Sequence, residues 1–210
     1  AHVGGGMRGE FNLRFGQPSK DVCYIIPELF PFTDTEQKDA LTGREDGLLG
    51  RMVSQGNVPK IMFTNSSAEY WRGDAALIHT NIENNSDAPE HPNVRRYHFS
   101  GTQHGSGKYP LETVRESDSV RGNFPFNGVN YTPILRGCLT NMNNWVKGEN
   151  DPPPSSHPKH EDGSAIETKD VIGKFSKIPG IRLPDRVLNP MRLDYGDEQH
   201  LGRTVKLPPE

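Results

Sequence analysis

Two residues of this sequence are well suited to catalysis, a glutamate and a histidine that each follow a short apolar segment. Glu69 comes four residues after the segment 60–65, and His104 comes five residues after the segment 94–99. A carboxylate that hydrogen-bonds one nitrogen of an imidazole fixes its tautomer, so the other nitrogen can take a proton from a nucleophile. The pair therefore has the chemistry of the acid and base of a serine–histidine–acid relay, with Asp74 as a competing acid.

Positioning these side chains together requires two neighbouring strands whose carboxyl ends meet at one edge of a sheet. The segments 60–65 and 94–99 have the composition of short strands, and about 28 residues with a helical candidate separate them, which is the spacing of a parallel βαβ unit. Ligand sites in open parallel sheets lie beyond the carboxyl ends of the strands. We therefore expect an α/β fold in which the two segments are parallel neighbours.

The clearest helix is predicted over residues 133–147. Thr132 is a suitable N-cap, Pro133 stands at the first helical position, and Gly148 ends the pattern. Apolar residues recur at a spacing of three to four, which predicts one stripe packed in the core. The members of this stripe are Leu135, Cys138, Leu139, Met142, Trp145 and Val146.

The chain divides by composition into three parts. Residues 1–150 hold the predicted strands and helices, and we expect them to form a partial α/β core. Residues 151–165 are rich in proline and read as a linker. Residues 166–210 show no clear periodicity and carry several prolines, so they are predicted to be an extended tail that packs on a larger body.

The overall composition excludes some classes of protein. The 210 residues carry 24 Lys and Arg against 27 Asp and Glu, so no basic surface for nucleic acid is expected. No apolar run approaches the roughly 18–20 residues that span a bilayer. Hydrophobic residues make up only 32% of the chain, beside 22 Gly and 18 Pro. That share predicts a loop-rich domain that completes its core with residues from another segment or chain. The sequence leaves the cellular compartment undecided, and a secreted or periplasmic location is compatible with it.

A nucleophile to match the acid and base is missing from the sequence. No Gly-x-Ser-x-Gly pattern, the tight turn that presents a catalytic serine, occurs anywhere. Ser66 and Ser67 follow a strand but lack those glycines, while Ser100 and Ser106 bracket His104 on the same loop. Because the chain also opens without a methionine, we expect a processed end, a fragment or an incompletely resolved protein.

A weaker alternative is a metal-dependent enzyme. His157, His160 and Glu161 are close in sequence and carry groups that bind divalent metals. They stand in a proline-rich segment, where a solvated turn is the simpler interpretation. Serine, histidine and acid chemistry needs no cofactor, so none is expected.

Several blocks of the sequence closely resemble the family called alpha/beta hydrolase domain proteins. The two most specific blocks are PKIMFTNSSAEYWRGDAALIHT at 59–80 and YHFSGTQHG at 97–105. Shorter similar blocks stand at 9–19, 46–49, 145–146, 152–155, 178–184 and 192–196. The resemblance covers almost the whole chain.

The resemblance implies the C-terminal half of an α/β-hydrolase parallel sheet with helices on its faces and an extended Pro-rich tail. Family members are longer and carry their serine upstream of the block at 9–19. By that likeness His104 is the general base, Glu69 the acid and Asp74 the reserve. The implied activity is hydrolysis of a small carboxylic ester, with the serine in a remaining N-terminal segment or a partner chain. The alternative is a catalytically inactive binding or scaffold fragment of the same fold.

Overall fold

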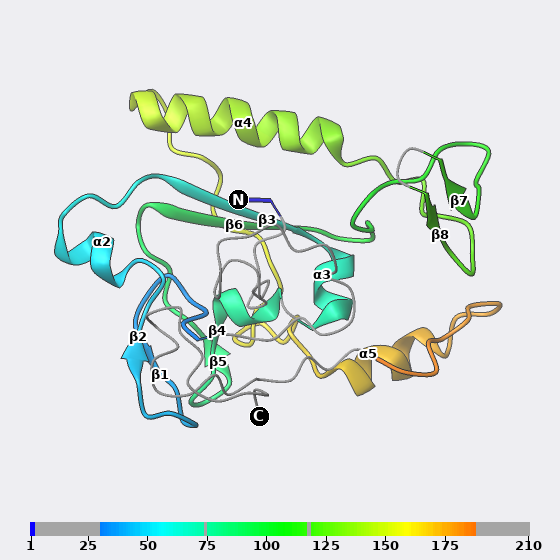
Figure 1. Ribbon diagram of the computed structural model, residues 1–210, viewed down its shortest axis with the longest axis horizontal. Coiled ribbons are helices and arrows are strands. Elements are labelled where there is room, and N and C mark those ends of the chain that lie inside the picture. The colour runs from blue at the N-terminus through cyan, green and yellow to red at the C-terminus, as the bar shows by residue number, and fades with distance from the viewer. Residues whose placement is uncertain (3–29, 74, 117–118, 188–210) are drawn as a thin grey trace.

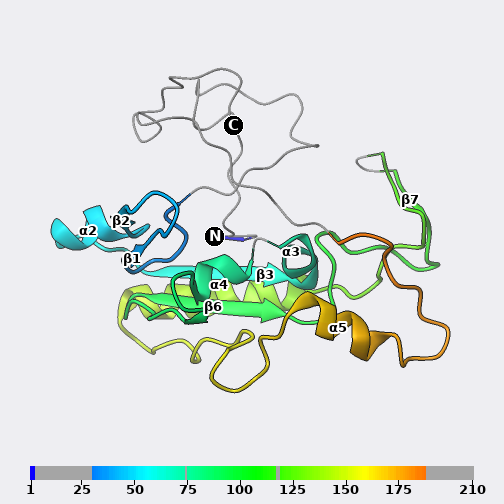
Figure 2. The ribbon, with the colours of Figure 1, turned by 90° about the horizontal axis from the view of Figure 1, so that it is seen from below.

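Two parallel strands, β3 (Ile61–Ser66) and β6 (Val94–Phe99), lie at the centre of the computed structural model (Figure 1). The structure describes residues 1–2, 30–73, 75–116 and 119–187, so Asp74 and the end of the predicted tail lie outside the described residues. Ile61 pairs with Val94 and Ser66 with Phe99, which confirms the predicted parallel pairing. Figure 2 shows both strands pointing the same way, so their carboxyl ends meet at one edge.

Short segments extend this sheet on both sides. His2 forms a parallel bridge with Thr64 of β3, and the Thr64 amide donates to the carbonyl of Ala1 at 3.0 Å. On the far side of β6, Ser156 bridges Tyr97, although it stands in the segment expected to be a linker. The four segments therefore run parallel to one another, in the order residues 1–2, β3, β6 and the segment at Ser156.

Helices lie on both sides of the sheet, with α4 (Thr132–Lys147) on one and α3 (Ser67–Arg72) on the other (Figure 1). The predicted helix over 133–147 is confirmed, but Tyr131 rather than Thr132 is its N-cap residue. Gly148 ends the helix in the left-handed region, with φ of 73°. A residue without a side chain adopts that conformation at little cost.

The stripe of α4 is less buried than its apolar pattern predicts. Trp145 is 3% exposed, whereas Leu139 and Val146 are 70% and 66% exposed. The prediction that the whole stripe is core is therefore wrong for the described structure. The physical reason is the width of the sheet, since among the described residues only two full strands lie beneath a 16-residue helix.

The remaining elements are short. They are β1 (Gln37–Lys38), β2 (Glu45–Asp46), α2 (Gly50–Ser54), the 3-10 helix η1 (Ala76–His79), β4 (Thr80–Asn81), β5 (Ser86–Asp87), β7 (Val114–Arg115), β8 (Val120–Arg121) and α5 (Thr168–Phe175). The pairs β1–β2, β4–β5 and β7–β8 are antiparallel. Among the described residues, no helix is long and apolar enough to cross a bilayer.

Helix α5 corrects the prediction that residues 166–210 are extended throughout. Val171 and Ile172 are half-buried on one side of this helix, and the ring of Phe175 meets Trp71 of α3 edge to face at 5.9 Å. Eight residues with a central glycine, Gly173, give too short a periodic pattern to stand out in the sequence. The division of the chain at residues 150 and 165 stays a prediction.

A buried histidine closes η1. His79 is 1% exposed, its Nε2 lies 2.9 Å from the Tyr70 hydroxyl, and its ring centroid lies 4.2 Å from that of His157. Burial, together with the nearby His157, lowers the pKa of His79 to about 3. The ring is therefore neutral in the folded protein at any pH near neutrality.

His79 is expected to make the protein sensitive to acid. Because the ring of the unfolded chain takes a proton below pH 6.5 and the folded ring does not until about pH 3, acid favours unfolding in this interval. The free energy of unfolding should fall by about 1.4 kcal/mol per pH unit from this residue alone. Between pH 7 and pH 4, urea unfolding of the His79→Gln protein should show a smaller decrease in the free energy of unfolding per pH unit than that of the wild type. The exposed control, His160→Gln, should keep the wild-type slope, and equal slopes for all three proteins would contradict the prediction.

Candidate active site

The junction between β3 and α3 holds Glu69 in a fixed orientation. Ser66 is the N-cap of α3, and its hydroxyl accepts a hydrogen bond from the Ala68 amide at 3.2 Å. Glu69, three residues on, turns back so that its Oε2 accepts from the Ser66 amide at 2.7 Å and from the Ser66 hydroxyl at 2.6 Å. This reciprocal capping arrangement follows from the Ser-x-x-Glu spacing. It buries the carboxylate completely at the carboxyl end of β3.

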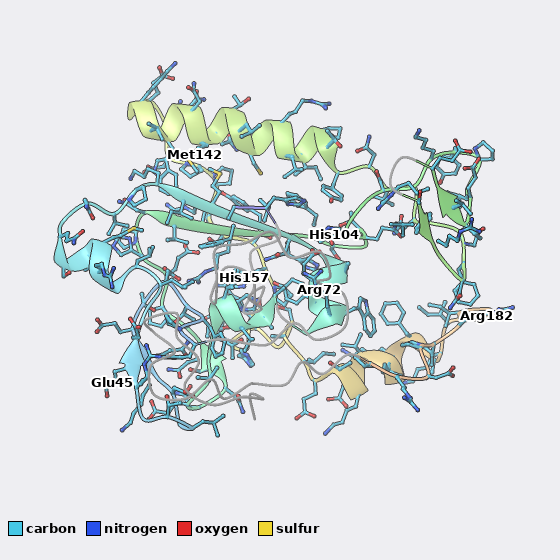
Figure 3. All side chains as sticks on the ribbon, viewed as in Figure 1. Glu45, Arg72, His104, Met142, His157 and Arg182 are labelled. Carbon is cyan, nitrogen blue, oxygen red and sulfur yellow. The ribbon has the colours of Figure 1, made fainter. Side chains whose placement is uncertain are left out.

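His104 reaches the other oxygen of the same carboxylate. Its Nδ1 lies 2.8 Å from Glu69 Oε1, so the structure brings together the two residues singled out in the sequence. The histidine side chain is 57% exposed while the glutamate side chain is fully buried. Figure 3 places His104 beside α3, where the two strands end. Since a carboxylate only accepts hydrogen bonds, Nδ1 carries the proton and Nε2 is left as an acceptor.

The charge of Glu69 is maintained by its hydrogen bonds. Burial by itself opposes ionisation, but hydrogen bonds from the Ser66 hydroxyl, from His104 and from the Ser66 amide outweigh it. The net effect is a lowered pKa for the Glu69 carboxyl. The group that faces the imidazole at neutral pH is therefore a carboxylate, as a relay requires.

The turn that carries His104 is held to its surroundings by polar contacts. Gly101, whose φ is 71°, donates its amide hydrogen to the hydroxyl of Ser67 at 2.9 Å. The Thr102 hydroxyl donates to the Phe99 carbonyl at 2.6 Å, and the amide side chain of Asn127 donates to the Gly101 carbonyl at 2.8 Å. The turn is thus tied to β6, to α3 and to the segment before α4.

Ser67 and His98 form a pair that the sequence did not predict. The Ser67 hydroxyl lies 3.1 Å from His98 Nε2. The His98 ring packs at 4.4 Å from the ring of Tyr70, as expected for a packed strand residue, and burial lowers its pKa. In the part of the chain that the structure describes, no hydrogen bond to a carboxylate orients this imidazole. The pair therefore lacks the third group of a relay, and Ser67 serves to join α3 to the turn after β6.

The residues of the metal alternative do not converge. His157 Nδ1 lies 2.9 Å from the Pro158 carbonyl and its ring lies against His79. His160 Nε2 approaches Thr80 at 3.5 Å, and Glu161 pairs with Lys159 at 2.6 Å. Within the described ranges, no group of three His, Cys, Asp or Glu side chains is placed to hold a metal ion.

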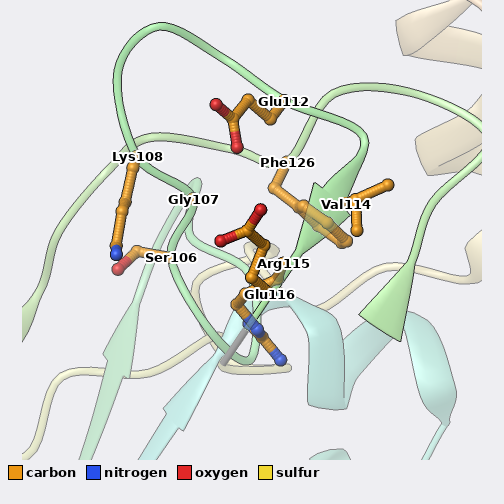
Figure 4. Close-up of a pocket in the computed structure, with 8 residues that line it drawn as sticks. All are labelled: Ser106, Gly107, Lys108, Glu112, Val114, Arg115, Glu116 and Phe126. Carbon is orange, nitrogen blue, oxygen red and sulfur yellow. The ribbon is translucent and has the colours of Figure 1, made fainter. Parts of the chain in front are cut away.

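A small pocket opens in the segment that follows His104 (Figure 4). Its volume is about 80 Å³, and it lies between residues 106–108 and the β7–β8 hairpin. The lining residues are Ser106, Gly107, Lys108, Glu112, Val114, Arg115, Glu116 and Phe126. Side chains of both charges line the pocket, and its size and polarity suit bound water, so we assign no ligand to it.

Comparison with known proteins identifies the family. Residues 20–207 match the family described as Alpha/beta hydrolase domain. Neither the curated proteins nor the solved structures contain a match to this chain. The parallel pair β3–β6, with helices on both sides, agrees with that match in fold. The chain belongs to the alpha/beta hydrolase domain family.

Proposed function

We propose that this chain supplies the acid and the base of a serine-type hydrolase that cleaves carboxylic esters. The observation that carries the proposal is the 2.8 Å contact between His104 Nδ1 and the buried carboxylate of Glu69. An acid that is already charged and an imidazole with an exposed edge are what a general base needs. Asp74 remains the reserve acid of the sequence prediction.

The proposed reaction has two halves. A serine hydroxyl attacks the acyl carbon of the ester while His104 Nε2 takes its proton, and the imidazolium that forms is stabilised by Glu69. The same proton then passes to the departing alcohol, which leaves an acyl-serine. Water attacks that acyl group and gives a proton to Nε2, which passes it to the serine oxygen as the acyl–oxygen bond breaks. The carboxylic acid and the free serine hydroxyl are released.

The nucleophile in this proposal is a serine outside the 210 residues. The sequence contains no Gly-x-Ser-x-Gly, and no described serine hydroxyl is hydrogen-bonded to His104 Nε2. A further segment of the same protein or a partner chain would supply it. The alternative function, a catalytically inactive binding or scaffold piece, rests on this same observation.

Labelling with a fluorophosphonate probe, which reacts with activated serines, tests the proposal. Protein produced from the complete reading frame should take up one label, on a peptide outside these 210 residues. His104→Ala should abolish labelling, whereas Ser67→Ala should retain the label at a lower rate, because Ser67 holds the turn of His104 but is not the nucleophile of this proposal. A label on Ser67 would overturn the proposal that the nucleophile lies outside these 210 residues. Absence of both labelling and ester hydrolysis in the complete protein would instead favour the scaffold.

A further inference from the structure

The orientation of the His104 imidazole cannot come from packing. Its side chain is 57% exposed, and within the described residues the only hydrogen bond of its ring is the one to Glu69. A surface ring with a single contact keeps its direction only if the backbone that carries it is fixed. The contacts made by the carbonyl groups of His104 and Gly105 therefore matter for the direction of Nε2.

Tyr131 holds the carbonyl group of His104 itself. The tyrosine hydroxyl donates to this carbonyl at 2.5 Å. Tyr131 is 7% exposed, its ring lies 5.5 Å from the ring of Phe99, and it is the N-cap residue of α4. The hydrogen bond therefore ties His104 to the start of the longest helix and to the end of β6.

The hydroxyl of Tyr131 is itself held from the sheet. His2 Nε2 lies 3.3 Å from it, and His2 Nδ1 lies 2.8 Å from the Thr64 hydroxyl. Since the tyrosine proton goes to His104, its oxygen accepts from His2 Nε2–H, and His2 Nδ1 accepts from Thr64. Burial lowers the pKa of His2, which agrees with the neutral ring that this order of donors needs. One continuous set of hydrogen bonds thus runs from β3 to His104.

Arg115 and Gln103 both hold the next carbonyl group. Arg115 Nη1 donates to the Gly105 carbonyl at 3.1 Å, and the Gln103 side-chain amide donates to the same oxygen at 2.5 Å. The guanidinium of Arg115 lies 5.6 Å from the centre of the Phe126 ring. A side chain at position 105 would place its Cβ 2.2 Å from Nη1. Gly105 is not among the residues with a positive φ, so an alanine here would displace the tip of Arg115 without straining the backbone.

From these contacts we infer that Tyr131 and Arg115 are positioning residues, which hold the consecutive carbonyl groups of His104 and Gly105 and so keep the imidazole of His104 on Glu69. Their effect on turnover rests on the proposed function, but their effect on the ring does not. A misplacement of about 1 Å in a reacting group can cost roughly a hundredfold in rate. We therefore expect losses in kcat and little change in KM.

The first test compares two tyrosine variants of the complete protein. Tyr131→Phe removes one hydroxyl and should lower the kcat for ester hydrolysis about 10- to 100-fold. Tyr109→Phe is the matched control, because Tyr109 lies between His104 and Tyr131 in the chain and is 79% exposed. This variant should keep the wild-type kcat. Equal kcat values for the two variants would overturn the effect of Tyr131 on turnover, whereas its effect on the ring is judged by the resonance described below.

The second test breaks the arginine contact in two ways. Arg115→Lys removes the fork of the guanidinium, and Gly105→Ala forces the flexible arginine tip aside without requiring an unusual φ. Both should lower kcat by a similar factor, with Arg121→Lys on β8 as the control at wild-type level. An Arg115→Lys protein with wild-type kcat, wild-type KM and an unchanged His104 Nδ1–H resonance would remove Arg115 from the proposal.

A readout independent of turnover separates this inference from the proposed function. A histidine Nδ1–H bonded to a carboxylate gives a far-downfield proton resonance, and the resonance lost in His104→Ala belongs to this contact. Tyr131→Phe and Gly105→Ala should broaden or remove it, and Tyr109→Phe should leave it unchanged. Loss of the resonance without loss of turnover would keep the positioning role and overturn the proposed function. An unchanged resonance in Tyr131→Phe would overturn the positioning role.

Discussion

Replacing His104 with alanine should lower the kcat for ester hydrolysis by the complete protein about 10³- to 10⁴-fold. The imidazole is the only group placed to take the proton of an incoming serine beside the carboxylate of Glu69 within the described residues. Without it the attacking oxygen keeps its proton, and the alcohol leaves without a donor. Steady-state hydrolysis of a short-chain aryl ester measures the effect.

The same variant should leave the fold intact. The His104 side chain is 57% exposed, so its removal opens no cavity in the core. The urea midpoint at pH 7 should therefore match that of the wild type. His160→Ala, which truncates another exposed histidine, should retain both stability and turnover. A His104→Ala protein with undiminished turnover on its best ester would remove this chain from the catalytic machinery.

Much of the site could be predicted because it depends on local sequence. The strands β3 and β6 are short apolar segments at the spacing of a βαβ unit, and parallel strands align their carboxyl ends. Ser66 and Glu69 stand at the spacing of a capping box, which fixes the carboxylate within one turn of α3. His104 needs only a short turn from the end of β6 to reach that carboxylate.

The contacts that the sequence missed join residues far apart in the chain. His2 meets Thr64 and Tyr131, and Arg115 reaches back to Gly105 through a hairpin. No periodicity records such contacts, because they depend on how separate segments pack. The exposure of Leu139 was missed for a similar reason, since an apolar stripe shows what a helix can bury but not how wide the opposing sheet is.

Replacing Glu69 with glutamine should lower kcat about 10³-fold, through the tautomer of His104. The two carboxylate oxygens accept from different donors, Oε1 from His104 and Oε2 from the amide and hydroxyl of Ser66. A glutamine has one acceptor oxygen and one donor group on its amide. Because the backbone amide of Ser66 can only donate, the glutamine oxygen must face it, and the NH₂ group then faces His104. Nδ1 becomes an acceptor, the imidazole proton moves to Nε2, and the base is blocked.

Glu69→Ala separates this effect on the tautomer from the simple loss of the carboxylate. Alanine leaves His104 free to adopt either tautomer, so we expect a loss in kcat of only about 10²-fold, smaller than for glutamine and for His104→Ala. Alanine also leaves the buried amide of Ser66 without its acceptor, which should lower the free energy of unfolding by about 1–3 kcal/mol, whereas glutamine keeps that hydrogen bond. Glutamine should therefore give the more stable and less active protein. Steady-state kinetics rank the activities of the two variants, and urea unfolding ranks their stabilities. If the alanine variant were the less active of the two, Glu69 would act by its charge alone and not by fixing the tautomer of His104.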